Sequence, residues 1–253
     1  MFSPATADLG LVLGCEQRII NAWPAVTTLL IGSYAVRFAN GYSGRANSAS
    51  AVVQSAELDD EAFSLIEALY RKEGLPPCIR LTPLVGEATR ERALARGYRV
   101  KDASFGMIAD ISGREQVLDA QVRIEDRPSE AWIAGVAARQ TGVKTHVGNL
   151  TAILSQIRLP GAFASVVIDG EPVAYGMSVA ERGMAEIGLI VVDAAQRGQG
   201  LGQRLVGGLM AWAAGQGCGS AYLQVEENNA VAMRLYDRLG FRKLYRYETR
   251  ILD

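Results

Sequence analysis

The chain has 253 residues, 49% of them hydrophobic and 21% charged, with 26 basic and 27 acidic side chains. This length allows one large domain or two small ones, and the apolar fraction is sufficient for a full core. The net charge of −1 argues against a general nucleic-acid-binding protein, because no basic excess is available to contact phosphates.

The N-terminal segment, the cysteines and the single histidine bear on location and metal binding. Residues 1–17 have no basic leader before their apolar stretch, and no apolar run reaches the roughly 18 residues of a membrane span. Cys15, Cys78 and Cys218 are widely spaced, and His146 is expected on a surface helix. This composition is typical of a reducing compartment and lacks metal-type spacing. We therefore expect a cytoplasmic protein without a membrane partner or a bound metal.

The first half is predicted to alternate helices and strands. Apolar spacing predicts a helix over residues 8–22, and two extended stretches at 26–39 and 46–54 flank the turn dipeptide Asn40-Gly41. A helix should begin near residues 58–60 and end at Gly74. The other predicted elements are a strand at 78–83, a helix at 86–97, a long strand at 98–111 and a connection at 112–120.

The second half repeats this alternation. Pro128 is expected in the first turn of a helix reaching Thr141. Turn dipeptides at 169–170 and 182–183 should join three antiparallel strands. The predicted strands are 121–125, 162–170, 171–181, 183–193, 220–227 and 241–252, and the further helices are 145–158, 199–216 and 228–240. The segment ALARGY (93–98) is echoed by LYDRLGF (235–241), which hints at two related α/β units.

Residues 195–203 read AQRGQGLGQ, between a strand ending at Val192 and a helix beginning near Gly200. The first amide N–H groups of a helix have no intrahelical acceptor and, with the helix dipole, bind anions. Glycines would let a phosphate approach the backbone. Because Gly200 and Gly202 each cost the helix roughly 1 kcal/mol, the segment predicts a phosphate or pyrophosphate site. The alternative is a plain strand-to-helix turn.

Two other phosphate-binding motifs fit less well. A P-loop would need a lysine and a hydroxyl that this segment lacks. Gly198-Gln199-Gly200 begins a dinucleotide fingerprint, and acidic residues follow at 226–227, but Gln203 is too large for the third glycine position. The preceding strands also look antiparallel, whereas a dinucleotide fold begins with a parallel unit. A nucleotide-dependent oxidoreductase is therefore disfavoured.

Two motifs resemble the GNAT superfamily of acyl-CoA-dependent N-acyltransferases. Residues 197–202, RGQGLG, are similar to its (Q/R)xxGx(G/A) motif, and residues 229–241, NAVAMRLYDRLGF, resemble its N-x-x-A-x-x-L-Y-x-x-x-G-F helix. The resemblance covers about residues 121–253. It implies an α/β (α+β) fold in which helices flank a mixed, mostly antiparallel sheet.

The first half resembles the degenerate N-terminal unit of tandem GNAT proteins, through WPAV (23–26) and GYSGRANS (41–48). The resemblance thus implies a degenerate GNAT-like domain at residues 1–118 and an acetyl-CoA-binding catalytic domain at 119–253. The (Q/R)xxGx(G/A) segment at residues 197–202 is called the glycine loop below. Since the first half has no such loop, we expect no second cofactor site there.

The resemblance also implies where acetyl-CoA binds, in a cleft between splayed strands. The pantetheine arm would pair with the strand edge, and Asn229 would bond one of its amides, act as a helix N-cap, or do both. The pyrophosphate would meet the amides of the glycine loop. The expected cofactor-binding residues are Ile190, Val191, Val192, Arg197, Gly198, Gln199, Gly200, Leu201, Gly202 and Asn229.

Two residues are candidates for proton transfer. Tyr236 would protonate the departing CoA thiolate, since a phenol of pKa ~10 facing a thiol of ~8.5 makes the transfer uphill by only about 2 kcal/mol. The alternative is a core tyrosine. A lysine-like amine is neutral only about once in 2,500 molecules at pH 7, so a base helps. Glu186 matches in spacing the glutamate that some protein-lysine-acetylating GNATs use; the alternatives are a solvent-facing strand residue, with water as base.

The resulting expectation is an N-acetyltransferase that moves the acetyl group of acetyl-CoA to a primary amine by direct attack. The acceptor is a small-molecule or protein amine, and a homodimer is possible. The alternative is a non-catalytic acyl-CoA-binding or regulatory module, which would not need the proton donor Tyr236.

Overall fold

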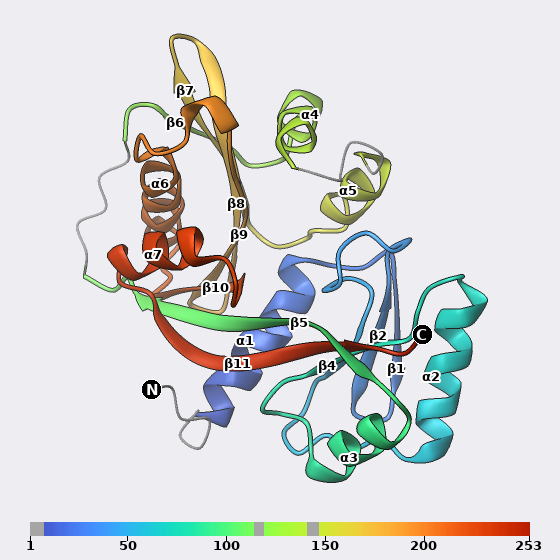
Figure 1. Ribbon diagram of the computed structural model, residues 1–253. Coiled ribbons are helices and arrows are strands. Elements are labelled where there is room, and N and C mark those ends of the chain that lie inside the picture. The colour runs from blue at the N-terminus through green and yellow to red at the C-terminus, as the bar shows by residue number, and fades with distance from the viewer. Residues whose placement is uncertain (1–7, 114–118, 141–146) are drawn as a thin grey trace. The chain divides into compact units, whose positions relative to one another are not determined.

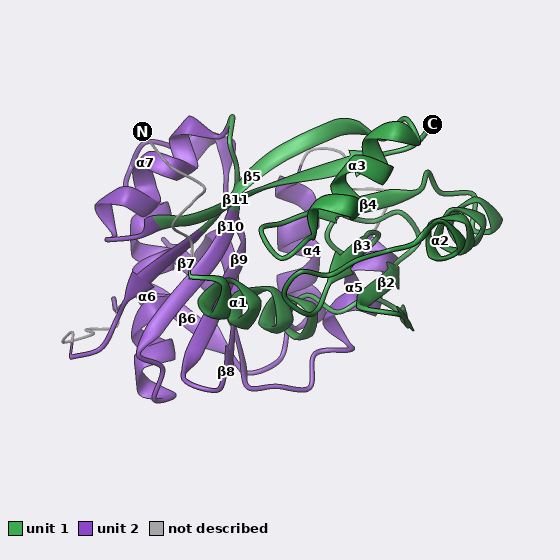
Figure 2. Ribbon diagram, turned by 90° about the horizontal axis from the view of Figure 1, so that it is seen from below, with its two compact units in different colours: residues 1–106, 225–228, 243–253 green, residues 107–224, 229–242 purple. Residues whose placement is uncertain are grey.

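The computed structural model describes residues 8–113, 119–140 and 147–253. These residues form two compact units, each assembled from separate segments of the chain (Figure 2). Unit 1 contains the described residues up to 106 together with 225–228 and 243–253, and unit 2 contains those of 107–224 and 229–242. His146 and part of the expected connection at 112–120 lie outside the described residues. The division into domains at 118/119 stays a prediction.

Unit 1 is a sheet with helices on both faces. Its strands lie in the order β1-β2-β3-β4-β11-β5, in which β3 and β4 pair in parallel. Arg37 and Phe38 of β2 point to opposite faces because they are successive strand residues. Tyr70 of α2 stacks on Phe38, with ring centroids 4.8 Å apart. The elements are α1 (Leu9–Ala22), β1 (Thr27–Ile31), β2 (Tyr34–Phe38), β3 (Ala49–Ala51), α2 (Asp60–Lys72), β4 (Cys78–Leu81), α3 (Glu87–Ala95), β5 (Arg99–Asp110) and β11 (Arg242–Ile251).

The extended stretch expected over residues 26–39 is a hairpin instead. β1 and β2 pair antiparallel from Thr27 opposite Phe38 to Ile31 opposite Tyr34. The turn falls at Gly32, whose φ of 54° suits a residue without Cβ. Asn40 and Gly41 do adopt positive φ, but they lie within a loop over 39–48 that leads to β3.

The motifs WPAV and GYSGRANS meet in that loop. Asn47 accepts from the amides of Ala39 and Gly41 at 2.7 and 3.0 Å and donates to the carbonyls of Tyr42 and Ser43. The indole of Trp23 donates to Ser43 Oγ at 2.9 Å. In unit 1 the hydrogen bonds of the two motifs therefore stabilise the conformation of the loop over 39–48.

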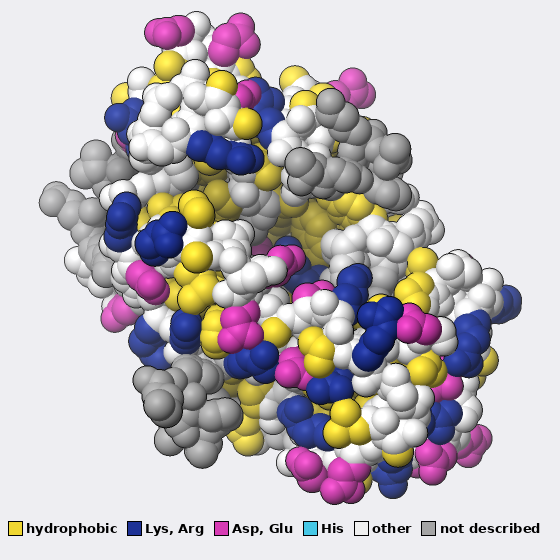
Figure 3. Space-filling model, viewed as in Figure 1, with side chains coloured by type: hydrophobic (Ala, Val, Ile, Leu, Met, Phe, Trp, Pro, Cys, Tyr) yellow, Lys and Arg dark blue, Asp and Glu magenta, His cyan; other side chains and the backbone are white. Residues whose placement is uncertain are grey.

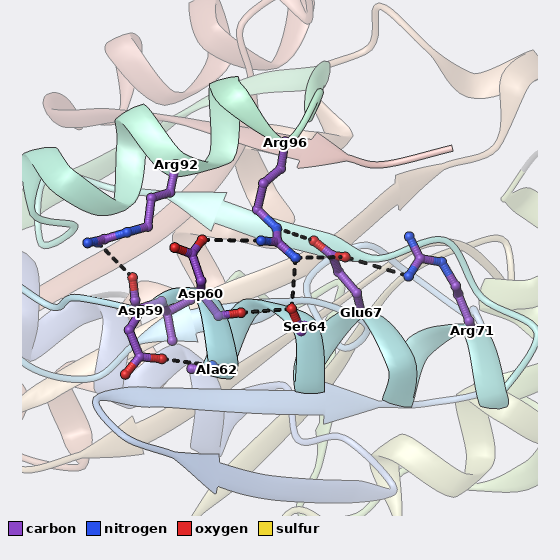
Figure 4. Close-up of polar contacts among 9 residues, drawn as sticks. Asp59, Asp60, Ala62, Ser64, Glu67, Arg71, Arg92 and Arg96 are labelled. Atoms are coloured by element: carbon purple, nitrogen blue, oxygen red, sulfur yellow. Dashed lines mark hydrogen bonds and ion pairs between the residues drawn. The ribbon is translucent and has the colours of Figure 1, made fainter.

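A buried ion pair ties α1 to the sheet of unit 1. Arg80 donates to both carboxylate oxygens of Glu16 at 2.6 and 3.1 Å, and both residues are at most 1% exposed. The Tyr245 hydroxyl also donates to Glu16. Arg96, the C-cap residue of α3, contacts α2 through Glu67 at 2.8 Å, Asp60 at 3.2 Å and Ser64 at 3.0 Å (Figure 4).

Unit 2 contains the second half of the predicted alternation. Its strand order, starting from the end of β5, is β5-β10-β9-β8-β7-β6, with antiparallel pairs from β9 to β6 and a parallel pair between β9 and β10. Helices α6 and α7 lie on one face of this sheet and α4 and α5 on the other (Figure 1). The elements are β6 (Val122–Glu125), α4 (Glu130–Arg139), α5 (Val147–Leu154), β7 (Gly161–Ile168), β8 (Glu171–Glu181), β9 (Met184–Val192), a 3₁₀ turn (Ala194–Gln196), α6 (Leu201–Gly215), β10 (Ser220–Glu226) and α7 (Ala230–Arg238).

Small residues let the helices of unit 2 approach the sheet closely. A Cβ on Gly176 of β8 would meet Leu205 and Leu209 of α6 at 3.2 and 3.3 Å. On the other face, Trp132 of α4 packs edge-on against Phe163, with centroids 5.3 Å apart. The fold class is thus as predicted: a mixed, mostly antiparallel sheet flanked by helices.

One helix start differs from the prediction. Ser129 is the N-cap of α4, and its hydroxyl accepts from the amide of Trp132 at 3.2 Å. Pro128 therefore precedes the helix instead of lying in its first turn, because the serine satisfies an N–H group that would otherwise lack an acceptor. The antiparallel turns are confirmed: Asp169-Gly170 and Arg182-Gly183 all have positive φ.

The charged side chains on the face shown in Figure 3 are interspersed, with Lys and Arg beside Asp and Glu. In the described part of the chain, no helix is long and apolar enough to cross a bilayer. The same residues contain no group of three or more His, Cys, Asp or Glu side chains placed to hold a metal ion.

Candidate functional site

Strand β9 carries a bulge near its C-terminal end. Met177 of β8 lies opposite Gly188 and Tyr175 opposite Val191, so two residues of β9 face one residue of β8. Leu189, within the bulge, has a φ of 53°, which is rare for a branched side chain. A bulge bends its strand and re-aims the residues that follow.

β9 and β10 part just before this bulge. Their ladder pairs residues 184–186 with 220–222, and in the described chain it is not recorded beyond Glu186. β9 nevertheless continues to Val192 and β10 to Glu226. The backbone groups of Ile190, Val191 and Val192 on the β10 side are therefore a sheet edge that an extended ligand can pair with.

The glycine loop (residues 197–202) follows this edge after Asp193 and the 3₁₀ turn over Ala194–Gln196. Gly198 and Gly200 have φ values of 81° and 78°, and a Cβ on either would meet nothing within 4 Å. Both glycines are thus required by backbone conformation, not by a neighbouring protein atom. Gly200 is the N-cap of α6 and supplies no side-chain cap.

The amides of this loop point to an anion site. Gln203 and Arg204 donate to the carbonyl of Gly200 at 3.0 and 3.1 Å. For the amides of residues 197–202, no protein acceptor is recorded among the described residues. Consecutive N–H groups at the positive end of a helix favour a phosphate group.

Gly202 meets a packing requirement, and its predicted contact with the cofactor stays a prediction. Its φ is not positive, and a Cβ there would lie 3.1 Å from Leu235 Cδ2 of α7. The absence of a side chain lets α6 lie against α7. The motif glycines therefore combine two physical requirements, positive φ at 198 and 200 and close helix packing at 202.

Asn229 is the N-cap of α7, which confirms one of its two predicted roles. Its Oδ1 accepts from the amide of Ala232 at 3.0 Å at the start of α7. Capping uses the oxygen only, so the side-chain NH₂ remains a donor. Binding to pantetheine stays a prediction.

Tyr236 is buried on α7 at 7% exposure. Its ring packs edge-on against Phe241 with centroids 5.7 Å apart. The described contacts are those of a core ring, and proton donation by its hydroxyl stays a prediction.

Glu186 lies on β9 where the ladder to β10 ends. It is 2% exposed, so the alternative of a solvent-facing strand residue is wrong. Its carboxylate lies beside Gly188 on the same face of β9: a Cβ on Gly188 would be 2.8 Å from Glu186 Oε1. The base role stays a prediction.

Two residues that shape this region were not predicted from the sequence. Asp193 follows the last residue of β9 and caps the 3₁₀ turn, accepting from the amide of Ala195 at 3.0 Å. Arg139, 54 positions earlier, forms an ion pair with it at 3.2 Å. An Asp before a turn is a local signal that sequence reading could have used, whereas the arginine partner has no local signal.

Comparison with known proteins agrees with this geometry. The family described as "Probable histone acetyltransferase Rv0428c C-terminal" matches residues 12–250. The chain is 26% identical over 242 residues to the uncharacterized N-acetyltransferase YobR of Bacillus subtilis, covering 93% of this chain and 96% of that protein. It is also 26% identical over 260 residues to the probable histone acetyltransferase Rv0428c of Mycobacterium tuberculosis, covering 96% and 74%.

Among solved structures, a putative GNAT-family acetyltransferase from Novosphingobium aromaticivorans has the same fold. Its TM-score is 0.59 at 21% identity, and the alignment covers 100% of both chains. The glycine loop, the parted strands and the family match over residues 12–250 lead to one conclusion: the chain belongs to the Rv0428c C-terminal family of GNAT acetyltransferases.

Proposed function

We propose that this protein is an acetyl-CoA-dependent N-acetyltransferase with its donor site in unit 2. The proposal depends most on one observation, the junction of β9 and α6. There an edge over residues 190–192 is followed, after one short turn, by loop amides at 197–202 that have no recorded protein acceptor among the described residues. An extended pantetheine amide chain followed by a pyrophosphate has the matching order of groups.

In this proposal different residues of unit 2 bind different parts of acetyl-CoA. Backbone groups of residues 190–192 pair with the pantetheine, and the Asn229 NH₂ donates to one of its carbonyls. Residues 197–202 offer their amides to the pyrophosphate, with no metal needed to neutralise it. The positive end of α6 adds favourable electrostatic free energy.

Proton transfers accompany the exchange of bonds. The neutral amine attacks the thioester carbon, a C–N bond forms and the C–S bond breaks. Tyr236 supplies the proton that the departing thiolate takes up. Glu186, directly or through a water, accepts the proton that the amine nitrogen loses.

The acceptor is a primary amine of a small molecule or a protein. The name of the mycobacterial relative, a probable histone acetyltransferase, makes lysine peptides a first class to screen, beside polyamines and aminoglycosides. Homodimer formation, cytoplasmic location and a degenerate N-terminal half remain predictions.

The test is turnover by Tyr236→Phe and Glu186→Gln once an acceptor is found. Loss of a general acid or base lowers kcat by about 10²-fold or more, while the Kd for acetyl-CoA should stay within about twofold. Full turnover by Tyr236→Phe would reject this residue as the acid. Acetyl-CoA binding without turnover of any amine by the wild type would favour the non-catalytic binding module.

A further inference from the structure

Arg139 ends α4 and lies on the face of the unit 2 sheet opposite α6. Its Nη2 donates to the Pro172 carbonyl at 3.2 Å and forms an ion pair with Asp193 Oδ2, also at 3.2 Å. Its guanidinium stacks over the Tyr175 ring, 5.1 Å from the centroid. Arg139 thus joins α4, β8 and the end of β9.

Asp193 uses every polar group that could set the course of the chain after β9. Its amide donates to the Val173 carbonyl at 2.8 Å, which ends the pairing with β8. Oδ1 caps the 3₁₀ turn at Ala195, and the Asp193 carbonyl accepts from Gln196 at 3.0 Å. The next residue after that turn is Arg197, where the glycine loop begins.

The two carboxylate oxygens of Asp193 therefore have separate partners. Oδ1 fixes the turn that leads into the loop, and Oδ2 is held by Arg139. The Asp193 side chain is 35% exposed and the Arg139 side chain 21%. An aspartate at such exposure can sample several rotamers, and the contact of Arg139 Nη2 with Oδ2 favours the one in which Oδ1 accepts from the Ala195 amide.

We propose that Arg139 is a positioning residue for the pyrophosphate loop, acting through Asp193. It presets the direction in which residues 197–202 present their amides, so that the ligand does not have to order them on binding. The inference rests on the proposed function. It assigns a role in donor affinity to a helix whose sequence shows no cofactor motif.

The test compares acetyl-CoA with S-acetylpantetheine, which lacks the pyrophosphate. We expect Arg139→Gln to raise the Kd for acetyl-CoA by about tenfold, the size of one lost charge-assisted hydrogen bond. The Kd for S-acetylpantetheine, followed by chemical-shift titration, should change by less than about twofold because that ligand does not reach the loop. Once an acceptor is known, the KM for acetyl-CoA should rise while kcat is retained.

Two further variants separate positioning from general destabilisation. Asp193→Asn keeps an oxygen for the cap but loses the ion pair, so it should raise the Kd for acetyl-CoA as Arg139→Gln does. The double variant should be no worse than either single one, as expected for one shared interaction. Arg139→Lys, which keeps the charge but not the fork, should recover part of the affinity.

Arg182→Gln is the matched control. Arg182 forms an ion pair with Glu181 at 2.9 Å, at the other end of β9, and its loss should leave both Kd values unchanged. If the wild type binds acetyl-CoA and the Kd is the same in Arg139→Gln and Asp193→Asn, the inference is overturned alone. An equal loss for both ligands would also overturn it, in favour of a folding role. If the wild type fails to bind acetyl-CoA, the proposed function falls and the inference with it.

Discussion

Glu186 and Gly188 share one face of β9, and the Glu186 carboxylate occupies the space that a side chain at 188 would need: a Cβ there would come within 2.8 Å of Oε1. Position 188 lies next to the bulge and at the end of the β10 ladder. The carboxylate is therefore held at the point where the two strands part.

Gly188→Ala should move this carboxylate without removing it. The displaced group is the end of a flexible side chain, so we expect a change in unfolding free energy below about 1 kcal/mol. If Glu186 is the base, a shift of about 1 Å lowers kcat by up to about 10²-fold. Urea unfolding and turnover check this, with Glu186→Gln as reference. Unchanged kcat in both variants would assign the base role to water.

Asn229 offers a way to separate capping from ligand binding. Asn229→Ala should destabilise the protein by about 1 kcal/mol because the Ala232 amide loses its acceptor. Asn229→Ser keeps a capping oxygen and the stability, but lacks the NH₂ group proposed to bind pantetheine. Calorimetric titration should then show weaker acetyl-CoA binding in both variants. Wild-type affinity in Asn229→Ser would leave Asn229 as a cap alone.

The Glu16–Arg80 pair should be essential for the fold of unit 1. Glu16→Gln leaves a buried guanidinium without its counter-charge, which costs about 3–5 kcal/mol. The double change Glu16→Met and Arg80→Met should restore much of this loss. In the variant Arg96→Met the Glu67 carboxylate, 7% exposed, keeps Arg71 at 3.5 Å as a partner, so the loss should be clearly smaller than for Glu16→Gln. Equal losses in urea unfolding for Glu16→Gln and Arg96→Met would contradict this account.

The buried thiols predict a loss of stability in alkali. Burial raises the pKa of Cys15 and of Cys78 to about 12. Between pH 8 and 10 the unfolded thiols, with a pKa near 8.5–9, lose protons that the folded ones keep, so stability falls as pH rises. The expected loss is about 1.4 kcal/mol per thiol. Urea unfolding of the variant Cys15→Ala, Cys78→Ala should show a correspondingly smaller pH dependence, and identical pH profiles would refute the prediction.

Element types were largely predictable because they depend on local signals. Alternating and helical apolar spacing located most strands and helices, and the positive φ values at Asp169-Gly170 follow from turn chemistry. The hairpin at Gly32 was missed because a single glycine within an apolar stretch also fits an uninterrupted strand. The echo of ALARGY in LYDRLGF has a local cause as well: Tyr98 and Phe241 each donate a backbone N–H five residues back, at 3.0 Å, across a glycine of positive φ.

Long-range contacts could not be read in this way. Glu16, Arg80 and Tyr245 are far apart in sequence, and charged residues are rarely placed in a core by pattern alone. The same holds for Arg139 and Asp193. The glycine loop was located because its motif is contiguous, but the separate requirement at Gly202 depends on Leu235, 33 residues later.

Ligand-dependent unfolding tests the central claim most directly, namely that the edge at 190–192 and the amides of 197–202 bind CoA. Purified protein would be melted with acetyl-CoA, CoA, NAD or NADP in separate samples. At about one hundred times its Kd, a ligand adds about 2.7 kcal/mol of stability. We expect acetyl-CoA and CoA to raise the Tm and the nicotinamide nucleotides to leave it unchanged. Stabilisation by a nicotinamide nucleotide alone would contradict it and would remove the roles proposed for Tyr236 and Glu186.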